Sequence, residues 1–197
     1  MIIDFEESFN TYDENILNNY GVFNYVCPTC GAKHSFIRHG TYERNICYSK
    51  DFKTTETTIE VLRLFCKSCE KTHAILPNDV VPYCIYSFSF MLDVLIEKII
   101  NFKKISEICE GFNISFQLIF NFLSRFIKFA NSCKYVLMNL GVLNNSGNPK
   151  EVLASFISYE KTNHNFSIKY FFYSSWPFLM SKFQNILPCP IYVGGTG

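Results

Sequence analysis

Carboxylates are scarce in the last third of the chain. After residue 130 of the 197, only Glu151 and Glu160 are acidic. Enzymes that transfer DNA strands with two divalent metals need three carboxylates, normally spread over more than about 100 residues, so this region cannot supply such a site. Histidine is equally scarce, because His164 is the only one in the second half. A serine or cysteine triad is therefore unsupported as well.

Signals of export, membrane insertion and nucleotide binding are also missing. Residues 1–4 lack the basic stretch and apolar run of a signal peptide. The apolar stretch 170–181 is too short to span a bilayer, and lysines interrupt the longer window around it. The Gly-Gly-Thr-Gly run at residues 194–197 lacks the lysine and helix of a phosphate loop. With nine cysteines, an odd number, we expect a reduced, cytoplasmic protein without a membrane partner.

Charge is distributed unevenly along the chain although the net charge is only +1. Residues 1–20 carry five acidic side chains and no basic one, whereas residues 31–75 carry eight basic and five acidic ones. Residues 84–140 carry six basic and four acidic ones. This body is mildly basic, which fits a modest phosphate-binding surface but not a strongly basic nucleic-acid protein. Few arginines beside many Lys, Asn, Ile and Phe indicate an AT-rich bacterial genome.

Two Cys-x-x-Cys turns are the most informative motif. They provide Cys27, Cys30, Cys66 and Cys69, four thiolates in the spacing that tetrahedral zinc prefers. Pro28 fixes φ in the first turn and Gly31 permits a positive φ, which lets backbone N–H groups face the thiolates. Glu70 stands where the second turn would most easily have glycine. The alternative is four reduced, buried cysteines, and His34, His39 or His73 could substitute as ligands.

The segment between the turns has the composition of β-strands. Three runs rich in β-branched and aromatic residues cover 35–38, 42–46 and 57–65, with turns at Gly40 and within 49–55. In the last run, alternation places Ile59, Val61, Arg63 and Phe65 on one face and Glu60, Leu62 and Leu64 on the other. A zinc ribbon of three or more short strands is predicted for residues 25–82, after an acidic leader at 1–24 with a helical piece near 14–19.

Helical periodicity begins after the prolines at 77 and 82. The first helix follows from about Phe88 to Ile100, and a second covers about 104–110. A turn at 111–114 precedes Ser115, a good N-cap for a third helix. We expect the buried stripe of that helix to contain Ile119, Phe122, Leu123, Phe126 and Ile127.

The second and third helices match the helix-turn-helix plan within residues 83–130. The outward side chains of the third helix are Gln117, Asn121, Ser124, Arg125 and Lys128. Gln and Asn pair with adenine, whereas Arg and Lys reach guanine or phosphate. This pattern predicts contacts with double-stranded DNA. The alternative is a structural bundle whose outer face is simply polar.

Several runs together resemble a known kind of protein. They are Cys27-Pro-Thr-Cys-Gly, His39-Gly-Thr-Tyr-Glu-Arg44, Val61-Leu-Arg63-Leu-Phe-Cys66-Lys-Ser-Cys69, Lys71-Thr-His-Ala-Ile-Leu-Pro77 and Val81-Pro-Tyr-Cys-Ile-Tyr-Ser87. Over about residues 25–130 the chain resembles an uncharacterised family of clostridial and related proteins, similar to the N-terminal zinc-ribbon and helix-turn-helix part of insertion-sequence transposases. The resemblance implies zinc held by the four cysteines and DNA binding of mobile-element origin, with no established activity. Glu70 departs from its expected glycine.

The expected fold is α+β, with a β zinc ribbon, a helical bundle and an aromatic-rich segment at 131–197. That segment either completes the core, forms a homo-oligomer interface, or is the remnant of a longer protein. The expected function is a cytoplasmic, non-enzymatic, zinc-dependent DNA-binding protein, with phosphate contacts from Lys33, Arg38, Arg44 and Lys67. A protein-interaction module is the alternative, and a nuclease is a more distant one.

Overall fold

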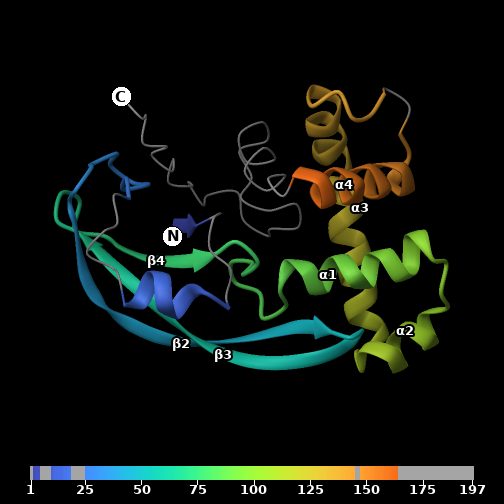
Figure 1. The fold of residues 1–197 in the computed structure, drawn as a ribbon, viewed down its shortest axis with the longest axis horizontal. Helices are drawn as coiled ribbons and strands as arrows, with labels where there is room; N and C mark the ends of the chain where they lie inside the picture. Colours follow the sequence, from blue (N-terminus) through green and yellow to red (C-terminus); the bar gives the residue numbers. More distant parts are fainter. Residues whose placement is uncertain (1, 5–9, 19–24, 145–146, 164–197) are drawn as a thin grey trace.

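The computed structural model describes residues 2–4, 10–18, 25–144 and 147–163. A curved sheet lies on one side and a group of helices on the other, and a long β-hairpin of the sheet extends to the helices (Figure 1). The architecture is α+β, as the sequence predicts.

Four strands form the sheet in the order β1-β4-β3-β2. β2 and β3 are antiparallel, β4 is antiparallel to β3, and β1 pairs parallel with β4. Their bounds are Ile2–Asp4 for β1, Phe36–Lys50 for β2, Lys53–Cys66 for β3 and Thr72–Pro77 for β4.

The hairpin of β2 and β3 is longer than the sequence analysis expected. Its two-residue turn, Asp51 and Phe52, has φ of 53° and 59°, and positive φ at both positions matches the twist of the flanking strands. The prediction of a turn at Gly40 is wrong. The register shifts between Arg38 and Gly40, where φ is 141°, so the glycine serves a β-bulge. A bulge bends a strand without ending it. The two short strands predicted at 35–38 and 42–46 are therefore one continuous strand, β2.

Both faces of the sheet are covered where β3 runs toward the cysteines. Ile59 and Val61 belong to one buried cluster, and Leu62 and Leu64 belong to another. The alternation predicted for this strand is thus confirmed, because successive side chains of a strand point to opposite faces. Val80 closes the first cluster.

The N-terminal residues contribute to this sheet. A π-helical turn, η1 (Asp13–Leu17), lies close to the helical piece expected from the sequence. Tyr12 is fully buried before it, and its hydroxyl donates to the carbonyl of Ile75 over 2.8 Å and accepts from the N–H of Leu62 over 3.0 Å. The described part of the acidic segment is therefore built into the β-core.

The helices form the second core. They are α1 (Phe88–Leu95), continued by the π-helical turn η3 (Ile96–Ile100), α2 (Ile105–Phe112), α3 (Phe116–Asn139) and α4 (Pro149–Asn163). Ser87 caps α1 by accepting from the N–H of Phe90. The rings of Phe90, Phe112 and Phe122 meet edge to face, which joins α1, α2 and α3 around one aromatic centre.

Two details of the helical prediction need correction. α2 continues through Gly111, and the left-handed residue that ends it is Asn113, with φ of 52°; asparagine tolerates this conformation better than most residues. Ile127 is 61% exposed rather than buried. It follows Phe126 by about 100° around the helix, which turns it out of the core. The cap at Ser115 is confirmed, since its side chain accepts from the N–H of Leu118.

The tip of the hairpin rests on the helices. The ring of Phe52 meets that of Phe112 edge to face at 6.3 Å, and the Thr54 hydroxyl donates to the Phe112 carbonyl. The connector before α1 is also fixed to β2, because Arg44 donates to the carbonyls of Val81 and Cys84 at 2.6 and 2.9 Å. Sheet and helices are thus held by contacts at both the tip and the middle of the hairpin.

α3 extends beyond residue 130, where the sequence analysis placed a boundary. Val152, Leu153 and Phe156 of α4 are buried in the helical core, so this part of the C-terminal segment packs on the bundle. The aromatic residues predicted to do so after Asn163 lie outside the described residues. Within the described ranges, no helix combines the length and apolarity needed to cross a membrane.

Candidate metal centre

The two Cys-x-x-Cys turns have the same backbone geometry. In each, the N–H of the first cysteine donates to a carbonyl five residues later, and its own carbonyl accepts from an N–H four residues later. These bonds are Cys27 to Ala32, Gly31 to Cys27, Cys66 to Lys71 and Glu70 to Cys66, at 2.8–2.9 Å. Gly31 and Glu70 both have positive φ, 72° and 57°. The second turn therefore adopts the predicted geometry although glycine is replaced by glutamate.

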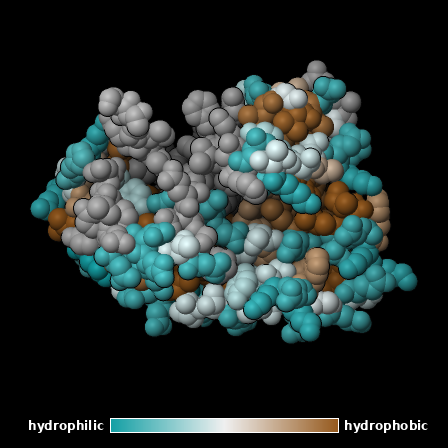
Figure 2. Space-filling view, in the orientation of Figure 1, coloured by the Kyte–Doolittle hydropathy of each residue, from teal (hydrophilic) through white to brown (hydrophobic). Residues whose placement is uncertain are grey.

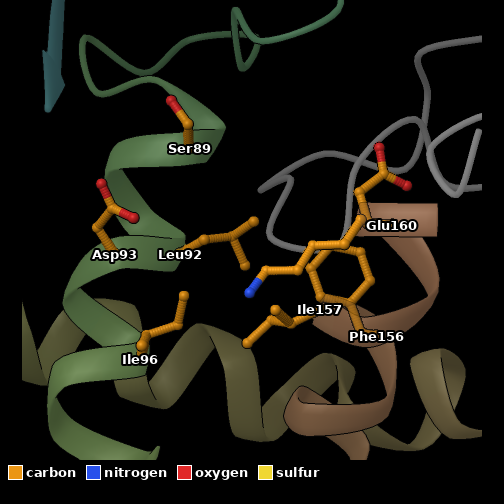
Figure 3. Close-up of a pocket in the computed structure, with 8 residues that line it drawn as sticks. Ser89, Leu92, Asp93, Ile96, Phe156, Ile157 and Glu160 are labelled. Atoms are coloured by element: carbon orange, nitrogen blue, oxygen red, sulfur yellow. The ribbon is translucent and has the colours of Figure 1, made fainter. Parts of the chain in front are cut away.

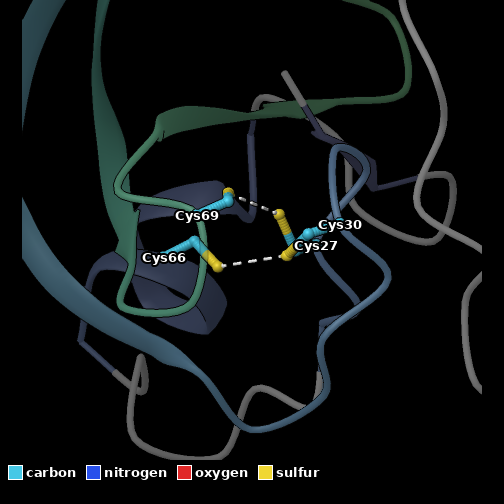
Figure 4. Close-up of side chains that lie close together, drawn as sticks. All are labelled: Cys27, Cys30, Cys66 and Cys69. Atoms are coloured by element: carbon cyan, nitrogen blue, oxygen red, sulfur yellow. Dashed lines mark hydrogen bonds between the residues drawn. The ribbon is translucent and has the colours of Figure 1, made fainter.

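The four thiols converge between these turns (Figure 4). All four Sγ atoms lie within 4.8 Å of one another, with Cys27 and Cys69 at 3.6 Å and Cys30 and Cys66 at 3.8 Å. These separations exceed the ~2.05 Å of a disulfide. A tetrahedral Zn–S4 centre with bonds of about 2.3 Å has sulfurs about 3.8 Å apart. The four cysteines thus fit a metal ion of that size and geometry.

Electrostatics favours a cation among these thiols. For Cys27, burial opposes ionisation, but the backbone N–H groups of Cys30 and Thr29 together with the thiols of Cys30 and Cys66 outweigh it and lower the thiol pKa to about 7. Burial, with the neighbouring thiols, raises the pKa of Cys69 to about 12. Without a cation the thiols cannot all ionise near neutral pH, since the thiolate charges repel. A divalent metal supplies the compensating charge.

His73, one of the three histidines considered as substitute ligands, is a neighbour of the centre. It is buried on β4, and its Nε2 lies 3.6 Å from Sγ of Cys27. Burial lowers its pKa to about 4, so the ring is neutral near pH 7. With the proton on Nε2, it donates to the thiolate and orients Cys27. Its position seven residues after Cys66 does not predict contact with Cys27, because sequence spacing alone does not show which strand packs against a turn.

The other two histidines considered as substitutes lie elsewhere. His34 is exposed with φ of 53°, and His39 is exposed at the bulge and stacks on Phe65 at 6.0 Å. Neither belongs to the cysteine cluster, which contains only cysteines among the residues that the structure describes.

The residues predicted to contact DNA share the outer side of α3. Gln117, Asn121, Ser124 and Lys128 are exposed, whereas Arg125 is half-buried with Nη1 4.0 Å from Sγ of Cys84. Three residues, from Asn113 to Ser115, separate α2 from α3. The metal centre lies at the opposite end of the hairpin from these helices. Along β3 the separation is roughly 40 Å at about 3.3 Å per residue (Figure 1).

One of the cations expected to bind phosphate has a structural role instead. The guanidinium of Arg44 donates to two carbonyls of the connector, which removes it from the set of free phosphate ligands. Arg38 donates to the carbonyl of Leu17 at 3.4 Å, while remaining exposed. Sequence position could not reveal the bonds of Arg44, since its partners are about forty residues away.

A groove of about 250 Å³ lies between α1 and α4 (Figure 3). Leu92, Ile96, Phe156 and Ile157 give it an apolar floor, and the carboxylates of Asp93 and Glu160 lie at its edges. Figure 2 shows the same apolar surface between the two helices. Among the described residues, Ser89, Asp93, Glu160 and Lys161 are the polar members of its lining. The apolar floor between them is suited to an apolar side chain.

Comparison with known protein families gives a match over part of the chain. Residues 27–109 match the family described as a domain of unknown function, DUF6431. This stretch contains all four clustered cysteines and ends within α2. It covers less than half of the chain. No curated protein and no solved structure matches the chain significantly.

Proposed function

We propose that this protein is a zinc-stabilised DNA-binding protein without catalytic activity, in which α2 and α3 act as a helix-turn-helix. The observation that carries the proposal is the placement of Gln117, Asn121, Ser124 and Lys128 on the outer side of α3, directly after a three-residue turn. The first turns of a recognition helix enter the major groove and contact base edges. The resemblance to transposase N-terminal regions adds an origin in mobile elements.

Charge on α3 supports a polyanionic ligand. The helix contains Arg125, Lys128 and Lys134 and no acidic residue. Lys50 and Lys53 are exposed beside the hairpin turn that contacts α2, so further cations stand near the start of the recognition helix. Together with Lys33, Arg38 and Lys67 they form the phosphate contacts that make binding depend on salt.

In this proposal the β-segment from residue 25 to 82 is a zinc ribbon, and zinc acts on stability rather than on DNA. The Cys27, Cys30, Cys66 and Cys69 thiolates bind the ion and close the open end of the hairpin, where a small β-module buries little apolar surface. A reducing compartment such as the cytoplasm keeps the thiols available.

The metal is tested by native mass spectrometry and thermal unfolding. We expect one zinc ion per chain and a lower melting temperature after chelation. Cys30 is exposed, so Cys30→Ser removes a ligand with little change in packing, and it should weaken zinc binding strongly. Cys109→Ser, outside the cluster, is the matched control. Absence of bound zinc, or equal zinc binding by both variants, argues against the ribbon.

DNA binding is tested by selecting duplexes from a random pool with zinc-loaded protein at low and moderate salt. Asn121→Ala should lose the enriched motif, and Lys128→Glu should weaken binding. Asn139→Ala, about 27 Å along the same helix from residue 121, and Lys161→Glu on α4 are the matched controls. If no duplex is bound, or if the controls behave like the test variants, the helix-turn-helix assignment fails.

The apolar groove between α1 and α4 favours a second candidate, a protein-interaction module. In that case a partner segment inserts an apolar side chain against Ile96 and Ile157. Ile157→Lys should then abolish partner binding, while Lys128→Glu leaves it intact. If the DNA-binding proposal is correct, Lys128→Glu weakens binding in the duplex assay and Ile157→Lys leaves it intact.

A further inference from the structure

The outer side of α3 is apolar as well as polar. Phe116 is 61% exposed, Phe120 is 46% exposed and Ile127 is 61% exposed. At 100° per residue these three side chains fall within about 40° of one another around the helix. They form a stripe beside the polar side chains named above. Exposed phenylalanines on a helix that also buries Phe122 and Phe126 call for an explanation other than packing.

Each of the two exposed phenylalanines of α3 directly precedes an amide side chain. Phe116 is followed by Gln117, and one helical turn later Phe120 is followed by Asn121. All four are exposed. Positions three apart on a helix are neighbours on its surface, separated by about 60° around the axis, so Phe120 lies beside Gln117. The rings and the amides therefore form two adjacent rows along the first turns of α3. The two turns differ by about 6 Å along the axis, or roughly two base-pair steps of 3.4 Å.

An A·T base pair offers complementary chemistry in the major groove. Adenine presents N7 and N6, which pair with the amide of Gln or Asn, and thymine presents a C5-methyl group, which makes apolar contacts with side chains such as Phe. A G·C pair has no methyl group and a different arrangement of donors and acceptors. The repeated ring and amide pair of α3 is therefore suited to A·T base pairs.

Charge selects DNA over another copy of this helix as the occupant of the stripe. The basic residues Arg125, Lys128 and Lys134 lie on a helix that has no acidic residue, so two such faces repel each other. The same charges attract a phosphate backbone on either side of the groove. The cap at Ser115 additionally leaves the positive end of the α3 dipole at the first of the two turns.

We propose that Phe116 and Phe120 contact thymine methyl groups while Gln117 and Asn121 pair with adenine, so that α3 prefers A·T-rich duplexes. This inference rests on the proposed DNA binding through α3 and specifies its target. The Ile127 side chain, two turns further on, extends the apolar stripe toward the flanking base pairs.

The test removes only the methyl groups from the DNA. Zinc-loaded full-length protein is titrated with an alternating d(A·T) duplex and with the same duplex carrying deoxyuridine for every thymidine. A covered methyl group is worth roughly fourfold in affinity, and two are worth about fifteenfold. We expect the wild type to lose affinity by such a factor, and Phe116→Ala/Phe120→Ala to bind both duplexes equally.

Three controls make the test specific. Phe102→Ala removes an exposed ring outside α3 and should keep the methyl preference, and Phe116→Leu should keep most of it. Replacing adenine by 7-deazaadenine removes the N7 acceptor and should weaken the wild type more than Gln117→Ala/Asn121→Ala. Circular dichroism establishes that the variants fold.

The outcomes separate the two levels of the proposal. Equal binding of thymine and uracil duplexes by the wild type overturns the methyl contact and leaves DNA binding standing. A methyl preference that survives in Phe116→Ala/Phe120→Ala also overturns it. If the wild type binds no duplex, the proposed function fails, and this inference fails with it. Phe116→Ala/Phe120→Ala could also lose self-association, measured by sedimentation, without any change in DNA affinity. That result assigns the stripe to a second copy of the chain and overturns the inference too.

Discussion

Glu70 occupies in the second Cys-x-x-Cys turn the place that Gly31 occupies in the first. Each residue follows the second cysteine of its turn, donates its N–H to the carbonyl of the first cysteine of the same turn, and has positive φ. Left-handed backbone costs a residue with a Cβ about 1 kcal/mol, and glycine avoids that cost. The two turns are therefore unequal in backbone strain although their hydrogen bonds are equal.

Substituting Glu70→Gly should stabilise the zinc-loaded protein. We expect the free energy of unfolding in urea to rise by about 1 kcal/mol, because the relieved strain exceeds the extra entropy of glycine in the unfolded chain. Gly31→Ala is the reciprocal control. A Cβ there meets no atom within 4 Å, so its expected loss of about 1 kcal/mol comes from φ alone. If neither variant changed the free energy of unfolding, the claim that positive φ strains the second turn would be contradicted.

Substituting His73→Leu should weaken metal binding while leaving the four ligands intact. Loss of the hydrogen bond to Cys27 should raise the zinc dissociation constant about tenfold, at the lower end of what outer-shell partners contribute. Competition with a chromophoric chelator measures it. His73→Gln retains a donor and should recover much of the affinity, whereas His39→Leu, at the exposed bulge, should have no effect. Equal affinity of the leucine variant and the wild type contradicts the assigned role.

Substituting Tyr12→Phe should destabilise the β-core. The hydroxyl bridges the Leu62 N–H and the Ile75 carbonyl, which face each other where the β3 and β4 ladder has ended. Without it both buried groups lose a partner, at a cost of about 2 kcal/mol. Urea denaturation measures this change. Tyr135→Phe, on a half-exposed ring of α3, should change stability by only a few tenths of a kcal/mol.

Contact between the hairpin tip and the helices should appear as coupling energy. In a double-mutant cycle, Phe52→Ala and Phe112→Leu should interact by about 1 kcal/mol, as edge-to-face pairs do. A second cycle with Phe52→Ala and Phe156→Leu should be additive within about 0.5 kcal/mol, because α4 does not form the docking contact of Phe52. Equal coupling in the two cycles would mean that the tip responds to the whole core rather than to Phe112.

Local sequence patterns predicted much of the fold. The paired Cys-x-x-Cys turns predicted the cysteine cluster, because each turn is closed by hydrogen bonds within six residues. Alternation in β3 predicted its two buried faces, and the cap at Ser115 was correct for the same reason, since its bond spans three residues. The metal identity and the DNA contacts of α3 stay predictions.

Features that depend on distant partners were missed. The three residues of β1 carry no strand signal of their own and pair with residues more than seventy positions away. The burial of Tyr12 likewise involves distant partners, because its hydroxyl bonds to Leu62 and Ile75. Ile127 was assigned to the core because an apolar stripe of width about 100° is ambiguous at its edge. Whether a borderline position is buried depends on which neighbour packs there.

The parallel pairing of β1 with β4 has a consequence for how the protein is made. Ile2 must wait for Ile75, its partner in the ladder. At about 5–20 residues per second, ribosomal synthesis separates the two by roughly 4–15 s. During that interval the nascent chain can close the hairpin of β2 and β3, whose pairing is local, but β3 lacks its other neighbour. A ribosome that stalls before residue 75 therefore holds a chain with an open strand edge, which is the species that chaperones would have to protect.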